Sequence, residues 1–249
     1  GFSQPDADAA QAALIWLHAL AVGYSQKYLT QNADGVRMDW PRIPLPNNAQ
    51  TLEKSAALGR QIANLLNTEN AVTGVTTGTL EAPYKLTGRI TKTNKESEIT
   101  DLALSTGWGH GGGENPVMPG KGKTDVRQWA NDERDELLAA AARLGLTETE
   151  LWEAVGKRAV DVWLNDSTYW RGVPEKVWDY TIGGYQVLKK WLSYRDERVL
   201  ERPLTLEEAR YFTETVRRLT ALCLLQPILD KNYRAVCVSW HVWRLFLLV

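Results

Sequence analysis

Side chains able to contact nucleic acid are concentrated between residues 85 and 189 of this 249-residue chain. Arginine can hydrogen-bond guanine in the major groove, lysine can bind backbone phosphates, and tryptophan can stack on an accessible base. Short strands and glycine-rich loops could present such side chains from a rigid scaffold. The candidate contact residues are Lys85, Arg89, Lys92, Trp108, Lys121, Lys123, Arg127, Arg171 and Lys189.

The same region also contains acids, which leave a purely structural interpretation open. A solvated surface of mixed charge would give the same sequence pattern. The formal net charge of −1 provides no general attraction for a polyanion, so any DNA surface would require local clustering of the cations. The acids among the candidates are Glu81, Glu96, Glu98, Asp101, Glu114 and Asp125.

The segment from Tyr169 to Arg195 is the densest in aromatic residues, with seven of them and five cations. Apolar residues from Tyr185 to Leu192 follow the spacing of one helix face. Gly183 and Gly184 stand at the predicted start of this helix. They would let backbone N–H groups approach an anion such as a phosphate. Alternatively, they only let the helix pack tightly on a neighbour.

No catalytic motif is complete in the sequence. Residues 120–124, Gly-Lys-Gly-Lys-Thr, resemble the end of a phosphate-binding loop, but that motif needs a glycine where Val117 stands. His110 opens a His-Gly-Gly-Gly run like the oxyanion loop of some esterases, yet the chain has no Gly-x-Ser-x-Gly motif. The Asn/Asp-Pro-Pro-aromatic turn of adenine methyltransferases is also missing. We therefore expect no catalysis by this chain itself.

The composition is typical of a globular protein, with 24% charged and 44% hydrophobic residues. Three histidines and two cysteines without ligand spacing indicate neither a metal site nor a disulfide framework. The apolar run Leu245–Val249 is too short to span a bilayer, and no signal peptide is visible. We expect a cytoplasmic protein without membrane association. Eleven tryptophans indicate large aromatic contacts, either in the interior or at a surface for stacking or a partner.

Hydrophobic periodicity and capping residues predict five further helices. Thr147 and Thr205 each precede a glutamate by three residues, the spacing of a capping box. Pro227 is expected to end the last helix. The apolar tail Val236–Val249 is predicted to be a buried strand or a short helix. The five helices are predicted at Asp8–Tyr28, Thr51–Asn67, Asp132–Leu144, Thr147–Lys157 and Thr205–Gln226.

The remaining segments predict strands, a loop and a connector. Alternation in Tyr84–Thr93 predicts two or three short strands within Val72–Thr106, and Ala159–Leu164 is predicted to be a buried strand. Thr106–Lys123 is so rich in glycine that we expect a loop rather than a packed element. Met38–Pro46 contains three prolines, which favour an extended connector of defined shape.

Residues 172–180, Gly-Val-Pro-Glu-Lys-Val-Trp-Asp-Tyr, and 182–192, Ile-Gly-Gly-Tyr-Gln-Val-Leu-Lys-Lys-Trp-Leu, form a distinctive pattern. With the helix and proline connector of residues 15–46, this pattern resembles the C-terminal specificity region of type ISP restriction–modification enzymes. The resemblance extends more loosely over residues 107–234, and an insertion-like stretch, 31–36, departs from it. Those enzymes are large single chains with nuclease, helicase-like, adenine methyltransferase and target-recognition parts, and this chain resembles only the last.

The predicted elements and the resemblance together indicate an α+β fold. Residues 1–70 would form a helical connector, the hinge to an absent methyltransferase domain. Residues 71–249 would form the target-recognition domain on which this connector packs. That domain would contain a small β-sheet, glycine-rich loops and a C-terminal helical part.

The resemblance implies sequence-specific recognition of double-stranded DNA, which would position an upstream adenine methyltransferase and a translocase or nuclease. The expected partners are duplex DNA and the methyltransferase domain of the same full-length chain. No cofactor is expected here, and S-adenosylmethionine, ATP and Mg²⁺ are implied only for the absent domains. The alternative is a structural or protein-interaction module of a DNA methyltransferase that does not contact DNA and buries its tryptophans in a domain interface.

Overall fold

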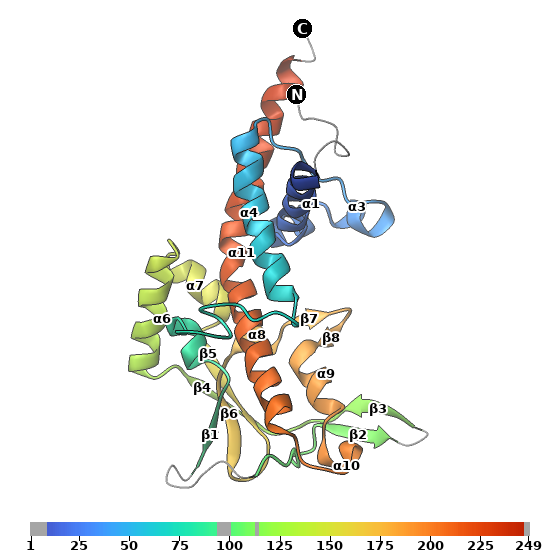
Figure 1. The fold of residues 1–249 in the computed structure, drawn as a ribbon, viewed down its shortest axis with the longest axis vertical. Helices are drawn as coiled ribbons and strands as arrows, with labels where there is room; N and C mark the ends of the chain where they lie inside the picture. Colours follow the sequence, from blue (N-terminus) through green and yellow to red (C-terminus); the bar gives the residue numbers. More distant parts are fainter. Residues whose placement is uncertain (1–8, 94–100, 113–114, 247–249) are drawn as a thin grey trace. The chain divides into compact units, whose positions relative to one another are not determined.

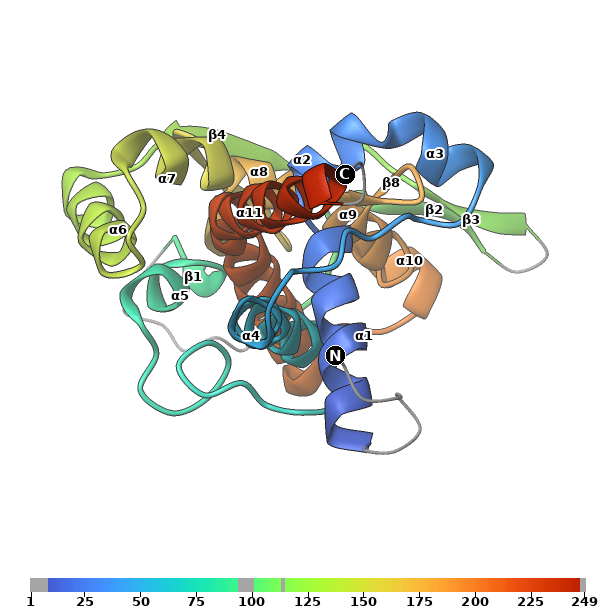
Figure 2. The same cartoon turned by 90° about the horizontal axis from the view of Figure 1, so that it is seen from above.

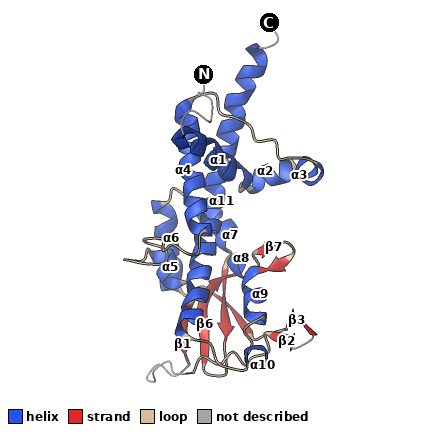
Figure 3. Ribbon diagram, turned by 45° about the vertical axis from the view of Figure 1, so that its right-hand side comes forward, coloured by secondary structure: helices blue, strands red, loops and turns tan. Residues whose placement is uncertain are grey.

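The computed structural model of the chain describes residues 9–93, 101–112 and 115–246 (Figure 1). Helices predominate, and the described strands form small antiparallel sheets (Figure 3). The predicted α+β class is therefore confirmed.

The chain divides into two compact units. The first unit consists of residues 1–70 and 224–249, and the second consists of residues 71–223. The long C-terminal helix α11, Leu206–Phe246, contributes its first part to the second unit and its last part to the first.

In the first unit, a close helix pair is formed by α1 (Ala9–Gly23) and α4 (Ala49–Leu66). Gly59 of α4 lies against the backbone of α1, and a Cβ atom there would overlap the carbonyl oxygen of Leu17. Glycine at this position is what lets the two helix backbones approach so closely. α4 covers most of the predicted helix Thr51–Asn67.

The predicted helix Asp8–Tyr28 is interrupted at Ser25. The Ser25 hydroxyl accepts a hydrogen bond from the Tyr28 N–H at 3.2 Å, and thereby caps a new helix. It also donates to the carboxylate of Asp230 in α11 at 2.6 Å. These contacts fix the break between two helices that periodicity alone would join. The helices after the break are α2 (Gln26–Gln31) and α3 (Ala33–Met38).

His18 ties the proline connector to α1 through a buried hydrogen-bond chain. Its Nε2 lies 2.9 Å from the carbonyl oxygen of Pro44, which can only accept, so this nitrogen carries the proton. Asn232 donates to the Ser55 hydroxyl at 2.9 Å, and that hydroxyl donates to Nδ1 of His18 at 2.8 Å. Burial lowers the pKa of His18. The chain is therefore satisfied by a neutral histidine, and His18 has a structural role.

The main sheet of the second unit has four antiparallel strands in the order β1–β6–β5–β4. Ile90, Trp170 and Val162 lie opposite one another on neighbouring strands, so their side chains share one face. The ring of buried Trp170 lies 4.1 Å from that of Phe212, so α11 covers this face (Figure 1). The strands are β1 (Arg89–Lys92), β4 (Thr124–Gln128), β5 (Arg158–Trp163), which matches the predicted buried strand, and β6 (Thr168–Pro174).

Two helices follow β4 in the chain, α6 (Asn131–Arg143) and α7 (Glu148–Val155). Both correspond to predicted helices, and Figure 2 shows them side by side. The capping box of α7 is present, because the Thr147 hydroxyl accepts from the Glu150 N–H and the Glu150 carboxylate accepts from the Thr147 N–H.

The segment 72–106 does not contain the predicted two or three strands in its described part. Its residues 82–86 form a short helix, α5 (Ala82–Leu86), with Pro83 in the first turn, where a missing N–H costs nothing. Among the described residues of this segment, only β1 is a strand. The alternating pattern of Tyr84–Thr93 was therefore misleading for its first half, and residues 94–100 lie outside the described residues.

Gly183 and Gly184 form the turn of a small hairpin, so the prediction of a helix start at these glycines is wrong. Their φ angles of 59° and 84° are both positive, as a tight two-residue hairpin turn requires. Leu188 and Leu192 are buried in the following helix, but Tyr185 lies in a strand and is exposed. The glycines thus offer no helix N-terminus to an anion. The short elements here are α8 (Glu175–Trp178), β7 (Thr181–Ile182), β8 (Tyr185–Gln186), α9 (Val187–Ser193) and α10 (Glu197–Leu200).

The glycine-rich segment 106–123 contains a packed hairpin, so the prediction of a loop is wrong. A Cβ atom at Gly109 would overlap the carbonyl oxygen of Ser193, and one at Gly122 would overlap the ring of Trp108. The glycines therefore permit close packing rather than mobility. The hairpin consists of β2 (Gly109–Gly112) and β3 (Asn115–Pro119), contacts α9 and α10, and extends beyond them (Figure 1).

Pro227 does not end the last helix, because α11 continues through it beyond the predicted range Thr205–Gln226. An internal proline removes one backbone hydrogen bond and costs about 3 kcal/mol. Leu225 and Leu229 on either side of it are buried, and such burial can offset that cost. The tail Val236–Val249 continues the same helix in its described part, instead of forming a separate strand or short helix.

Candidate nucleic-acid interface

The sheet face opposite α11 is polar and aromatic. The register of the strands places on it the side chains that alternate with Ile90, Trp170 and Val162. Most of these side chains are partly or fully exposed. We call this surface the polar face. Its members are Arg89, Thr91, Asp125, Arg127, Asp161, Trp163, Tyr169 and Arg171.

An aromatic pair occupies the middle of the polar face. The rings of Trp163 and Tyr169 have centroids 4.8 Å apart with an angle of 31° between their planes. The Lys123 ammonium lies 4.2 Å from the Trp163 ring centroid, and the Trp163 Nε1 donates to Asp125 at 2.7 Å. Fixed rings beside a cation can pack on the sugars and bases of a nucleic acid.

Glu133 of α6 binds both interior arginines of the polar face. Its carboxylate is 2% exposed and accepts from Arg127 at 2.6 and 3.1 Å and from Arg171 at 2.9 and 3.2 Å. Arg127 also donates to Asp161 at 3.0 Å. Burial by itself would raise the pKa of Glu133, but the hydrogen bonds from Arg127, the Ala130 N–H and Arg171 bring it below its ordinary value. Two cations and two anions thus form one fixed network.

A β-bulge sets the position of Arg171. Two residues of β6, Arg171 and Gly172, lie opposite the single residue Asp161 of β5. The Gly172 N–H donates to Asp161 at 2.8 Å, and Gly172 has a φ of +73°. A bulge redirects the neighbouring side chain, and here one glutamate can hold Arg171 and Arg127 together.

Two other cations at this surface are available to an anionic ligand. Arg89 is exposed, and among the described carboxylates none forms an ion pair with it. Lys123 makes a 3.8 Å contact with Asp166, whose side chain is fully exposed. Exposed ion pairs of this length contribute little and exchange readily.

The structure brings together four of the nine predicted contact residues. Arg89, Arg127 and Arg171 lie on the polar face, and Lys123 lies at its edge. The other five lie elsewhere. Lys85 is on α5 and forms an ion pair with Glu136 at 2.9 Å, and Lys189 is on α9. Lys92 is the last residue of β1, and its side chain points to the face of the sheet opposite the polar face. Lys121 is exposed after the β2–β3 hairpin, and Trp108 is buried.

Trp108 was predicted on an exposed loop, and this placement is wrong. The side chain is completely buried. The backbone N–H of Trp108 donates to the Asp196 carboxylate at 2.7 Å, and its indole Nε1 donates to the Trp163 carbonyl oxygen at 2.8 Å. Its ring meets Trp178 edge-on, with 5.6 Å between the ring centroids. Trp108 therefore anchors the base of the hairpin and supports the strand that carries Trp163.

Sequence reasoning missed the aromatic pair and the acids of the network. Asp161 gave a usable signal, because a lone acid inside a predicted buried strand must find a cation. Trp163 and Tyr169 are separated by a short turn, which indicates that they could meet across a hairpin. Glu133 gave no signal, because its role depends on where α6 packs.

The described residues contain no group of three or more His, Cys, Asp or Glu side chains that could hold a metal ion. Cys223 and Cys237 are free thiols, and burial raises the pKa of Cys223 to about 12. Among the helices as described, none combines the length and hydropathy needed to cross a membrane.

Residues 9–217 match a family model described as the type ISP C-terminal specificity domain. No curated protein and no solved structure matches the chain significantly. The matched residues include the whole polar face, the aromatic pair and the β2–β3 hairpin.

Proposed function

Because the chain belongs to the family of type ISP C-terminal specificity domains, we propose that it recognises a sequence in duplex DNA through its polar face. A domain of this family is a recognition module of restriction–modification rather than a catalyst. We choose the polar face because it contains the fixed aromatic pair Trp163 and Tyr169 together with the available cations Lys123 and Arg89.

Each part of the polar face has a distinct role in this proposal. Arg89 and Lys123 bind backbone phosphates, and the exposed Lys121, two residues after β3, adds a contact beside the polar face. Trp163 and Tyr169 pack on sugars and base edges. The network around Glu133 holds the sheet surface rigid, so that the contacts keep one register on the duplex.

Removing the two available cations should weaken binding to all duplexes. For Arg89→Ala combined with Lys123→Ala, we expect the slope of log affinity against log salt to fall by about two, one for each lost phosphate contact. Affinity at 50 mM salt should fall by about tenfold or more. Fluorescence anisotropy between about 50 and 200 mM salt, with a duplex selected from a random pool, measures both quantities.

Two exposed cations of α4 provide the matched control. Lys54→Ala combined with Arg60→Ala removes the same charges from the first unit and should leave the salt slope unchanged. Equal slopes for both double variants would remove the polar face from the DNA site. If the wild-type chain binds no duplex and selection enriches no sequence, the alternative of a structural or protein-interaction module is favoured.

We further propose that the first unit connects to an adenine methyltransferase domain and helps to position it on the target. Large exposed apolar side chains often mark contacts with another protein. The three most exposed among the described residues of this unit are Trp16, Met38 and Trp40, which are 76%, 87% and 86% exposed. The hydrogen bond from His18 to the Pro44 carbonyl oxygen fixes the connector Met38–Pro46, which carries Met38 and Trp40, to α1.

Trp16→Ser combined with Trp40→Ser should weaken association with a separately expressed type ISP methyltransferase domain by about 30-fold or more, as expected for loss of central aromatic contacts. Isothermal titration calorimetry measures this affinity. The control is Ile182→Ser with Tyr185→Ser, which removes exposed apolar residues from the second unit. An equal effect of the two pairs would contradict this docking role.

A further inference from the structure

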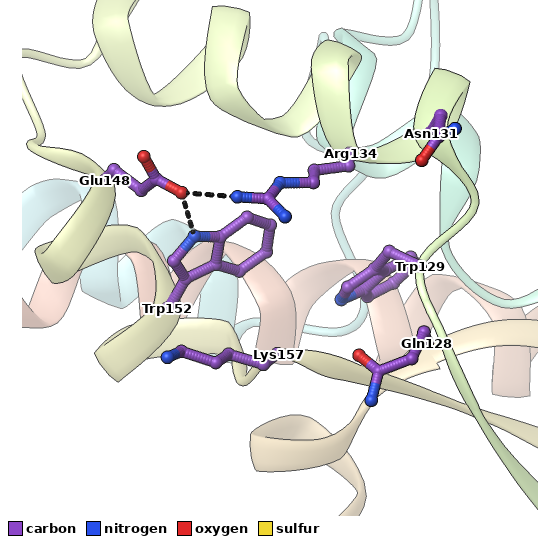
Figure 4. Close-up of a pocket in the computed structure, with 7 residues that line it drawn as sticks. All are labelled: Gln128, Trp129, Asn131, Arg134, Glu148, Trp152 and Lys157. Atoms are coloured by element: carbon purple, nitrogen blue, oxygen red, sulfur yellow. Dashed lines mark hydrogen bonds and ion pairs between the residues drawn. The ribbon is translucent and has the colours of Figure 1, made fainter.

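A pocket of about 340 Å³ lies between the end of β4, the start of α6 and α7 (Figure 4). Trp129 and Trp152 form its two ends. Two amides, two cations and the carboxylate of Glu148 line the other sides, with Arg134 and Asn131 on one side and Lys157 and Gln128 on the other.

Hydrogen bonds hold both indoles in place. Trp129 is buried except for 7% of its surface, and its Nε1 lies 3.4 Å from the Gly156 carbonyl oxygen. The Trp152 Nε1 donates to Glu148 at 2.9 Å, and the Arg134 guanidinium lies 5.6 Å from the Trp152 ring centroid. The aromatic ends of the pocket are therefore formed before any ligand binds, which lowers the entropic cost of binding.

The charged side chains that line the pocket are two cations, Arg134 and Lys157, and one anion, Glu148, so the lining has a formal charge of +1. Arg134 donates to Glu148 at 2.7 Å, and hydrogen bonds from Trp152 and Arg134 lower the pKa of that carboxyl, which is therefore an anion at neutral pH. Within the described ranges, no carboxylate lies at ion-pair distance from the Lys157 ammonium, although Lys157 contributes to the lowered pKa of Glu148. An anionic group can thus bind at Lys157 while Arg134 stays paired.

The pocket adjoins the polar face. The Arg127 guanidinium of the polar face lies 6.0 Å from the ring centroid of Trp129, which lines the pocket. Glu133, which holds the arginines, lies on the same helix as Asn131 and Arg134. A duplex on the polar face would therefore lie close to the Trp129 end of the pocket.

We propose that this pocket takes a single unstacked nucleotide. Its base lies between Trp129 and Trp152, the amides of Gln128 and Asn131 meet the base edge, and Lys157 binds the phosphate. Indoles suit the π-face of any base, and amides can both donate to and accept from its edge. If the nucleotide belongs to bound DNA, this inference rests on the proposed function. A free mononucleotide has the same base and phosphate groups and could bind in the same way.

The first experiment uses the complete 249-residue chain and a free probe, 2-aminopurine deoxyriboside 5′-monophosphate. Stacking on indole should quench the probe as the protein is added. Trp152→Ala and Gln128→Ala should each raise the dissociation constant, by about fivefold or more for the tryptophan. Trp40→Ala removes an exposed indole of the other unit and should leave the titration unchanged.

The second experiment places 2-aminopurine at successive positions of a duplex that the chain binds. Binding should change the fluorescence at one position, and Trp152→Ala should abolish that change while anisotropy still shows a bound duplex. If circular dichroism shows that Trp152→Ala is unfolded, Gln128→Ala decides both experiments.

The outcomes separate the two proposals. A bound duplex without any position-specific change, together with no quenching of the free probe, overturns the pocket and leaves the proposed function standing. Quenching of the free probe without duplex binding supports a mononucleotide site and contradicts the proposed function. Quenching that is equal in wild type, Trp152→Ala and Gln128→Ala also overturns the pocket.

Discussion

Glu133→Ala is expected to destabilise the second unit by about 3–5 kcal/mol, the cost of removing one member of a buried ion-pair network. The substitution leaves Arg127 and Arg171, whose side chains are only 25% and 30% exposed, without their shared carboxylate. It also removes the acceptor for the Ala130 N–H at the start of α6. Urea unfolding followed by circular dichroism measures the change in the free energy of unfolding.

Asp135→Ala is the matched control, because it removes an exposed acid from the same helix. Its free energy of unfolding should stay within about 0.5 kcal/mol of the wild-type value. Equal effects of Asp135→Ala and Glu133→Ala would show that the network does not stabilise the sheet.

The same network makes stability depend on pH. The pKa of Glu133 is lower in the folded chain than its ordinary value of about 4.5. Its contribution to stability is therefore fully present above about pH 4.5 and is lost as the pH falls through the folded pKa. Between about pH 5 and pH 3, the wild type should lose more stability than Glu133→Gln, which has no carboxyl group to protonate at this position.

Elements with strong local signals could be predicted from the sequence. The helix Thr147–Lys157 carries a complete capping box, and the structure contains it as α7. The buried strand Ala159–Leu164 appears as β5, because a short apolar run needs burial on both sides. In each case the residues that determine the element lie within it or next to it.

Elements that depend on distant partners could not be predicted. Gly109 and Gly122 look like loop residues in the sequence, but they are small because Ser193 and Trp108 pack against them. Gly183 and Gly184 fit a helix start and a hairpin turn equally well until the backbone angles are known. The rule that proline ends a helix fails at Pro227, because burial of apolar side chains on both sides of it stabilises the helix.

The candidate site shows the same division between local and distant information. Residue type identified Arg127 and Arg171 as candidate DNA contacts. That both bind the same carboxylate, Glu133, depends on the pairing of β5 with β6 and on the packing of α6. The aromatic pair Trp163 and Tyr169 depends on the same strand register. Composition can therefore name the charges at an interface, whereas strand register decides which of them already have partners.

Trp108→Ala should destabilise the second unit by about 3–5 kcal/mol, because it deletes a completely buried indole. It would leave a cavity beneath Gly122 and remove the hydrogen bond to the Trp163 carbonyl oxygen. Loss of that contact should also disturb the aromatic pair, so DNA affinity should fall together with stability. Thermal and urea unfolding, combined with anisotropy at 50 mM salt, measure both effects.

The control for this substitution is Trp40→Ala, which removes an exposed tryptophan and should change the free energy of unfolding by no more than about 0.5 kcal/mol. If Trp108 instead stacked on DNA from a mobile loop, Trp108→Ala would lower affinity without changing stability. Trp108→Phe separates the two roles further, because phenylalanine keeps an aromatic ring but cannot donate to the Trp163 carbonyl. Its stability should lie between wild type and Trp108→Ala if Trp108 anchors the hairpin, and should equal the wild-type value if it does not.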